Sequence, residues 1–288
     1  MFLKTFLVSR KNTFEIFLKK NKMNPFFSKM KNIDLDKLLK LDENRKPNHL
    51  GLYRMNCLVI GKTGTGKTTT LLKALLTGAI DDFGLIIFII PRESMDSGFY
   101  KKLNEAVKEK RIHLNLAFVV IGEDTLPTVE RINEISKIVK RPIAIVLDDF
   151  INAFNKKAGD WLVFKRYITQ LSRVKYGASL FALTQNWQQF ETQYRKNFNC
   201  FILFVNSLRE QNFREIMTSY YDYGNASKDE LHKLYNIFKQ DLHTPLWLIN
   251  CPNPDESMLY DGAYISPNDI LGNSPEIFSD SDSSEDSF

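Results

Sequence analysis

The chain has 288 residues, of which 43% are hydrophobic and 25% charged, which is ordinary for a globular protein and long enough for one α/β domain. No apolar run reaches the roughly 20 residues of a transmembrane helix, so we expect no membrane span, and the N-terminus lacks the features of a secretory signal. The three cysteines are widely spaced and predict free thiols rather than a zinc site: Cys57, Cys200 and Cys251.

The net charge of +5 hides a strong asymmetry along the chain. Residues 1–239 contain all 39 basic residues and 24 acidic ones, whereas residues 240–288 contain ten acids and no Lys or Arg. A basic body favours a polyanionic partner, and the Ser/Asp/Glu-rich end predicts a disordered tail. We therefore expect a basic helical N-terminal arm (1–50), a central core (51–252) and an acidic C-terminal tail (253–288).

Apolar runs and helical spacings alternate along the core. Strands are predicted at 55–60, 84–90, 114–121, 142–147, 178–183, 198–205 and 245–250. Helices are predicted at 68–76, 99–110, 128–140, 161–174, 208–220 and 227–239. Continuously apolar strands separated by helices indicate an α/β fold, with a mainly parallel central sheet sandwiched by helices.

The segment Gly-Lys-Thr-Gly-Thr-Gly-Lys-Thr (61–68) joins the first strand to the first helix and fits the phosphate-binding pattern G-x-x-x-x-G-K-[ST]. Backbone N–H groups and the helix N-terminus would face the phosphates, while Lys67 would reach the β- and γ-phosphates and Thr68 would bind Mg²⁺. The sequence therefore predicts a P-loop NTPase that binds ATP and Mg²⁺. The predicted nucleotide-binding residues are Gly61, Thr63, Gly64, Thr65, Gly66, Lys67, Thr68 and Thr69.

Two acids directly follow the strand predicted at 142–147, which we expect to lie beside the first strand. We assign Asp148, with Thr68, to Mg²⁺, and Asp149 to orienting or deprotonating the attacking water. Gln185 follows the strand predicted at 178–183 and is expected to sense the γ-phosphate or to position water.

Two arginines complete the set of candidate catalytic residues. Arg173 and Arg195 each precede a predicted strand. A loop at a strand edge can present an arginine to a neighbouring subunit's phosphates, where it neutralises charge in the transition state. For both arginines, a solvated side chain or a contact with DNA phosphate stays open as an alternative.

Residues 171–185 and 195–204 resemble the poxvirus-type genome-packaging ATPases, which belong to the DNA-pumping ATPases related to bacterial chromosome translocases. The shared pattern falls on Arg173, Gln185, Arg195 and Asn197. Val174 stands where the family often has His, and Asp149 where related translocases often have Glu. With the phosphate-binding loop and the two acids, the resemblance covers about residues 50–250.

The resemblance implies an ATP hydrolase that translocates double-stranded DNA and packages a viral genome into a preformed capsid. It further implies a homo-oligomeric ring, a pentamer or hexamer, that docks on a capsid protein in the host cytoplasm, in a viral factory or on the virion. Compact versions of this family occur in small DNA viruses and virophages.

Other classes of P-loop protein can be compared with the same residues. A GTPase needs N-K-x-D after a strand, but residues 155–158 read Asn-Lys-Lys-Ala, and the L-S-G-G signature of transporter ATPases is absent. A cellular-type DNA helicase or translocase and a P-loop small-molecule kinase stay open, although a kinase would not account for the basic body.

Overall fold

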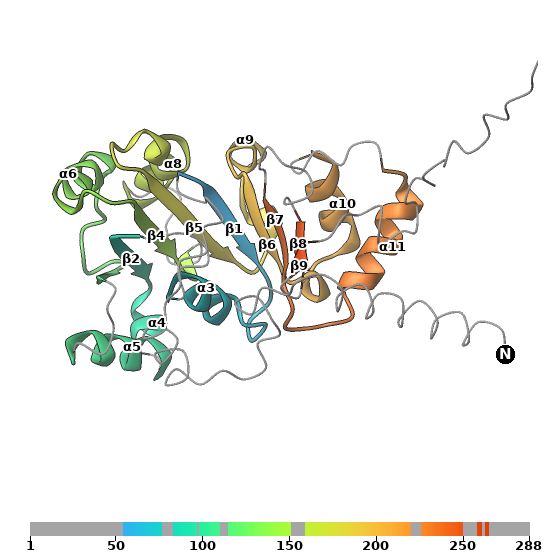
Figure 1. Ribbon diagram of the computed structural model, residues 1–288, viewed down its shortest axis with the longest axis horizontal. Helices are drawn as coiled ribbons and strands as arrows, with labels where there is room; N and C mark the ends of the chain where they lie inside the picture. The colour runs from blue at the N-terminus through green and yellow to red at the C-terminus, as the bar shows by residue number, and fades with distance from the viewer. Residues whose placement is uncertain are drawn as a thin grey trace, which may run out of the picture.

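The computed structural model describes residues 54–76, 83–96, 98–109, 115–150, 159–219, 226–249, 258–260 and 263–264 (Figure 1). The predicted N-terminal arm and most of the predicted acidic tail, including its serine-rich end, lie outside these residues. Among the described residues, no helix combines the length and the apolar character that crossing a membrane would require.

A nine-stranded sheet forms the centre of the protein, with the order β3-β2-β4-β5-β1-β6-β7-β8-β9. The first six strands in this order run parallel, and the last three pair antiparallel. The mainly parallel α/β sheet predicted from the sequence is therefore confirmed. The strands are β1 Asn56–Ile60, β2 Leu85–Ile90, β3 Leu116–Val120, β4 Ile143–Leu147, β5 Ala178–Thr184, β6 Cys200–Leu203, β7 Leu246–Ile249, β8 Met258–Tyr260 and β9 Ala263–Tyr264.

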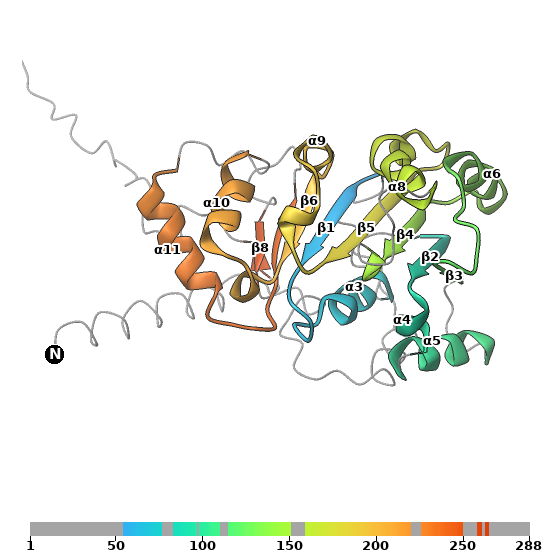
Figure 2. The same cartoon turned by 180° about the vertical axis from the view of Figure 1, so that it is seen from behind.

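Helices cover both faces of this sheet (Figures 1 and 2). Alternate residues of each strand point to opposite faces, so Leu58 and Ile60 join one hydrophobic core while Cys57 and Val59 join the other. The first core includes side chains of α6 Val129–Val139, α8 Gly159–Gln170, α10 Glu210–Ser219 and α11 Lys228–Phe238. The second includes side chains of α3 Lys67–Leu76 and α5 Gly98–Lys108. Burial on both faces explains why the strands are apolar without interruption.

All the strands and helices predicted between residues 55 and 250 are present, with boundaries that differ by a few residues. The sequence did not indicate the short elements: α4 Arg92–Met95, α9 Thr192–Arg195, and the 3₁₀ turns η1 Leu171–Arg173, η2 Trp187–Gln189 and η3 Val205–Ser207. These elements are too short to show a hydrophobic period.

The expectation that the strand ending at Asp148 lies beside the first strand is wrong. Strand β5 lies between β4 and β1, with Phe181 in register with Val146 on one side and Cys57 on the other. Strands β4 and β5 are both fully buried, so their composition does not reveal which of them is the neighbour of β1. As a consequence, the end of β5 comes between the phosphate-binding loop and the acids after β4.

The sheet also extends past the predicted core boundary at residue 252. Strand β8 pairs with β7 through Trp247 and Leu259, and its three residues are buried. Strand β9 pairs antiparallel with β8 through Leu259 with Tyr264 and Tyr260 with Ala263. These two strands were not predicted, because they are short and lie in a region whose composition is acidic.

Candidate active site

The phosphate-binding loop connects β1 to α3 at the carboxyl edge of the parallel strands. Gly64 and Gly66 have φ angles of 81° and 97°, a left-handed conformation that glycine adopts without the penalty of a Cβ. Gly61 is required for another reason, because a Cβ there would lie 2.6 Å from Thr65 Oγ1. The loop closes on itself through the Thr65 N–H and hydroxyl, which both donate to the carbonyl of Lys62, at 3.3 and 2.9 Å. This geometry fits the predicted phosphate cradle.

Lys67 begins α3 and is only 8% exposed. Its ammonium group donates to the carbonyl oxygens of Gly61 at 2.8 Å and Lys62 at 3.1 Å. Burial lowers the pKa of Lys67, and the carboxylates of Asp149 and Asp148 oppose this shift. The lysine is thus held inside the loop, where it can exchange carbonyl oxygens for phosphate oxygens.

Asp148 follows β4 and is 5% exposed. Its Oδ2 accepts hydrogen bonds from the Thr68 hydroxyl at 2.7 Å and from the Tyr100 hydroxyl at 2.5 Å. Burial raises the pKa of Asp148, while these two hydrogen bonds lower it. Burial and the Asp148 carboxylate raise the pKa of Tyr100 well above its ordinary value, so its hydroxyl stays protonated and donates.

Thr68 and Asp148, predicted as Mg²⁺ ligands, therefore lie in direct contact. Mg²⁺ in nucleotide sites uses one or two protein oxygens, several waters and the phosphates. The hydroxyl and carboxylate fit that donor set. Among the described residues, no group of three or more His, Cys, Asp or Glu is arranged to hold a metal ion, and a P-loop metal site does not need one.

Asp149 and Gln185 approach each other from neighbouring strands. The Gln185 Nε2 lies 3.4 Å from the Asp149 Oδ1, and both side chains are exposed at this edge. Asp149 has a φ angle of 48°, a left-handed conformation that Asp tolerates better than most residues. The Asp149 side chain is exposed, whereas that of the preceding Asp148 is buried. Next to Gln185, Thr184 accepts a hydrogen bond from the Gly61 N–H at 3.1 Å through its carbonyl oxygen, which ties the end of β5 to the loop.

The remaining predicted binding residues also lie in this loop. Thr63 is exposed at its turn, Thr65 is buried within it, and Thr69 lies in the first turn of α3. The structure thus brings together all predicted loop residues, both acids and Gln185.

Arg173 and Arg195 lie elsewhere in the protein. Each precedes a parallel strand, β5 or β6, and so lies toward the amino edge of the sheet, opposite the phosphate-binding loop. Figure 1 shows α9, which ends at Arg195, at that edge. Neither arginine is placed to act in the nucleotide site of its own chain.

Arg195 makes several contacts within its own chain. Its guanidinium group forms an ion pair with Glu215 at 2.8 Å, donates to the Phe190 carbonyl at 2.8 Å, and lies 4.7 Å from the centre of the Trp187 ring. The Trp187 Nε1 donates to the second oxygen of Glu215 at 2.9 Å. The Arg195 side chain is 11% exposed, so these contacts give it a structural role that the sequence did not indicate. Arg173, in contrast, is exposed.

Two residues near the site were not identified from the sequence. Tyr100 comes from α5, and His243 comes from the segment between α11 and β7, with its Nδ1 3.3 Å from the Thr65 carbonyl oxygen. Both lie far from residues 61–68 in the chain and belong to no motif, so no local pattern marks them as part of the site.

No protein-family model matches the chain, and no curated protein sequence is significantly similar to it. Among solved structures, the chain is similar to the genome packaging NTPase B204 from Sulfolobus turreted icosahedral virus 2. The complex of B204 with AMP aligns with a TM-score of 0.44 at 14% identity, over 74% of this chain and 98% of that chain. The complex with ATP-gammaS gives 0.43 and 14%, over 73% and 98%, and the sulfate complex 0.43 and 15%, over 72% and 95%. Similarity of this degree carries no argument about function, which must come from the residues of the site.

Proposed function

We propose that the protein is an ATP hydrolase that translocates double-stranded DNA and packages a viral genome into a capsid. One observation carries the enzymatic part of the proposal. The loop after β1, the acids after β4 and the glutamine after β5 meet at one edge of the sheet, with Thr68 on Asp148 and Gln185 near Asp149.

The arrangement favours hydrolysis by water over transfer to a small acceptor. Lys67 would release the carbonyls of Gly61 and Lys62 and bind the β- and γ-phosphate oxygens. Asp149 and Gln185 present a carboxylate and an amide on the exposed side of Asp148, and this pair can hold a water molecule and accept its proton. A bound Mg²⁺, held by Thr68 and Asp148, would neutralise the phosphate charge.

The DNA part of the proposal depends on charge and on the resemblance. The first 239 residues carry 39 basic and 24 acidic side chains, and such an excess suits a polyanion. The pattern of Arg173, Gln185, Arg195 and Asn197 resembles that of the genome-packaging ATPases and supports packaging as the purpose of DNA translocation. In this function the protein assembles into a homo-oligomeric ring, and the ring binds a capsid protein. A cellular-type translocase would use the same nucleotide site and differ in its partners.

Measurement of ATP turnover by the full chain, with and without double-stranded DNA, tests the proposal. We expect hydrolysis that DNA stimulates strongly, and a loss of at least about 100-fold in Lys67→Ala, because the charge on the transferring phosphoryl group is no longer stabilised. Since Lys67 is buried, circular dichroism must show that this variant is folded. Normal turnover by the folded variant would show that the loop does not take part in catalysis. An ATP turnover rate that is the same with and without DNA would exclude a DNA-translocating motor.

A further inference from the structure

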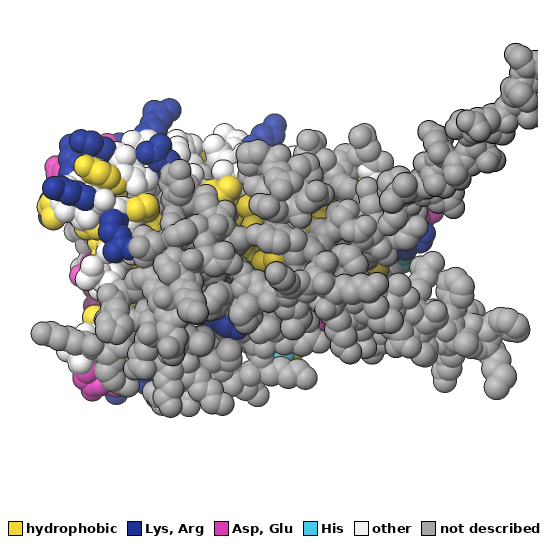
Figure 3. Space-filling model, viewed as in Figure 1, with side chains coloured by type: hydrophobic (Ala, Val, Ile, Leu, Met, Phe, Trp, Pro, Cys, Tyr) yellow, Lys and Arg dark blue, Asp and Glu magenta, His cyan; other side chains and the backbone are white. Residues whose placement is uncertain are grey.

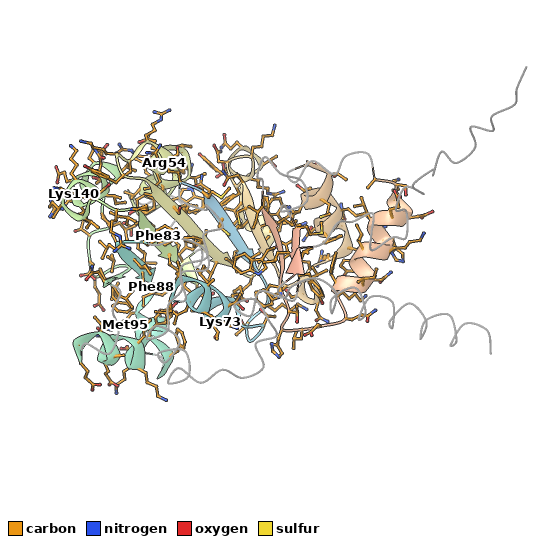
Figure 4. The ribbon with its side chains drawn as sticks, in the orientation of Figure 1. Arg54, Lys73, Phe83, Phe88, Met95 and Lys140 are labelled. Atoms are coloured by element: carbon orange, nitrogen blue, oxygen red, sulfur yellow. The ribbon has the colours of Figure 1, made fainter. Side chains whose placement is uncertain are left out.

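The amino edge of the sheet, opposite the phosphate-binding loop, carries a cluster of basic side chains. Arg54 precedes β1, Lys137 and Lys140 lie at the end of α6, and Arg173 and Lys175 precede β5. All five are exposed, and we call them the amino-edge basic cluster. Figure 3 shows Lys and Arg side chains gathered over the region of α6 and α8, and Figure 4 labels Arg54 and Lys140 at the same end of the molecule.

Hydrogen bonds hold the three segments of the cluster together. The Arg54 guanidinium donates to the Lys175 carbonyl at 3.2 Å. The Lys175 N–H donates to Asn133 of α6 at 3.0 Å, and the Tyr176 N–H donates to Ser136 of α6 at 3.2 Å. Lys137 and Lys140 each follow one of these α6 residues by one helical turn. The cluster is therefore one surface built from three segments, of which the first and the last lie more than 100 residues apart in the chain.

Within the part of the chain that the structure describes, this surface keeps its positive charge unpaired. The two acids of α6 are already paired, Glu134 with Arg131 and Glu130 with Arg166. No ion pair joins a cluster residue to any acid among the described residues. Ile138, 78% exposed, lies between Lys137 and Lys140 and adds an apolar contact area. Like charges held together in this way favour an anionic partner.

We infer that the amino-edge basic cluster binds the phosphate backbone of double-stranded DNA, an inference that rests on the proposed function and locates its DNA contact. Lysines and arginines from separate segments suit phosphates, which they bind without reading sequence. Single strands are bound mainly by stacking on aromatic rings, and the described residues of the cluster include no freely exposed ring. Tyr176, a described ring beside the cluster, is half-buried and has the Lys175 ammonium group 5.5 Å from its centre. DNA bound at the amino edge would not block the nucleotide site, which lies at the carboxyl edge of the sheet.

The test uses the full chain with Lys137, Lys140 and Lys175 changed to Gln, which removes three charges without introducing acids near the end of α6. Arg173 stays unchanged, because it is also a candidate catalytic residue. The matched control is Lys108→Gln/Lys228→Gln/Lys233→Gln, three exposed lysines on α5 and α11. Binding of a fluorescent DNA duplex is measured without nucleotide at several salt concentrations, together with ATP turnover without DNA and the melting temperature.

We expect the cluster variant to bind the duplex at least 10-fold more weakly than the control, with unchanged melting temperature and unchanged turnover without DNA. The slope of log affinity against log salt should fall by about 0.9 for each lost phosphate contact. Equal duplex affinity and equal salt slope in the two variants would overturn the inference, as would weaker binding only to single strands or to vesicles of anionic lipid. A wild-type chain that binds duplex but hydrolyses no ATP would refute the enzymatic proposal without contradicting DNA binding by the cluster.

Discussion

The hydroxyl of Tyr100 donates a 2.5 Å hydrogen bond to the same carboxylate oxygen of Asp148 that accepts from Thr68. Tyr100 lies on α5 and is 3% exposed, and its ring contacts Phe88 and Phe118 edge-on. This packing leaves the hydroxyl little freedom. Helix α5 thereby fixes the orientation of the carboxylate that we assign to Mg²⁺, as other metal ligands are oriented by the groups behind them.

We predict that Tyr100→Phe raises the Mg²⁺ concentration for half-maximal ATP turnover by about 10-fold, the usual cost of losing such an orienting partner. Binding of Mn²⁺ with nucleotide, followed by electron paramagnetic resonance, should weaken in parallel. Tyr235→Phe is the matched control, because it removes a buried tyrosine hydroxyl that bonds the Leu208 carbonyl away from the site. Identical Mg²⁺ dependence in the two variants would show that Tyr100 has no positioning role.

The two neighbouring acids should respond differently to substitution. We expect Asp149→Asn to bind ATP normally but to turn it over at least about 100-fold more slowly, because the amide cannot accept the proton of water. Asp148→Asn should in addition lose its dependence on Mg²⁺. Nucleotide binding and Mg²⁺ titrations of turnover distinguish the two. Small and equal losses in both variants would contradict the assignment of separate roles.

Arg195 and Arg173 should differ in their effect on stability. Arg195→Ala removes the ion pair with Glu215 and leaves that half-buried carboxylate without its charged partner, so we expect the free energy of unfolding to fall by about 1–3 kcal/mol. Arg173→Ala, at an exposed position, should change it by less than about 0.5 kcal/mol. Urea denaturation measures both. Equal stabilities would mean that the contacts of Arg195 contribute little.

Arg173 remains the candidate to act on a neighbouring subunit's phosphates. If it does, mixing Arg173→Ala subunits with Lys67→Ala subunits should restore part of the ATP turnover, because one type of mixed interface contains an intact loop and an intact arginine. Turnover is measured without DNA, so that DNA contacts do not contribute. Absence of rescue at every mixing ratio, with assembly confirmed by light scattering, would rule out action in trans.

The acidic end of the chain should compete with DNA for the basic body. We expect deletion of residues 274–288 to tighten duplex binding at low salt, because a tethered anionic segment acts at high local concentration. The gain should shrink as salt rises and screens the charges. Fluorescence anisotropy at several salt concentrations measures this effect. Unchanged affinity at low salt would instead point to docking or solubility as the role of the tail.

The sequence by itself determined the elements and the nucleotide-binding loop. Strands such as β2 and helices such as α6 were found within a few residues of their positions, because hydrophobic periodicity is a local property of the chain. The loop was found because its glycines and Lys67 must occupy fixed positions along the backbone. Asp148 could be predicted for a similar reason, since an acid directly after a buried strand is a local signal.

Only the tertiary structure decided how these pieces are arranged. The insertion of β5 between β4 and β1, the hydrogen bond from Tyr100 to Asp148, and the ion pair of Arg195 with Glu215 all join residues distant in the chain. Each depends on which surfaces pack together, and many pairings of equally apolar strands satisfy the same local pattern. The amino-edge basic cluster illustrates the same point, because Arg54, Lys137 and Lys175 become neighbours only when three separate segments meet at one edge of the sheet.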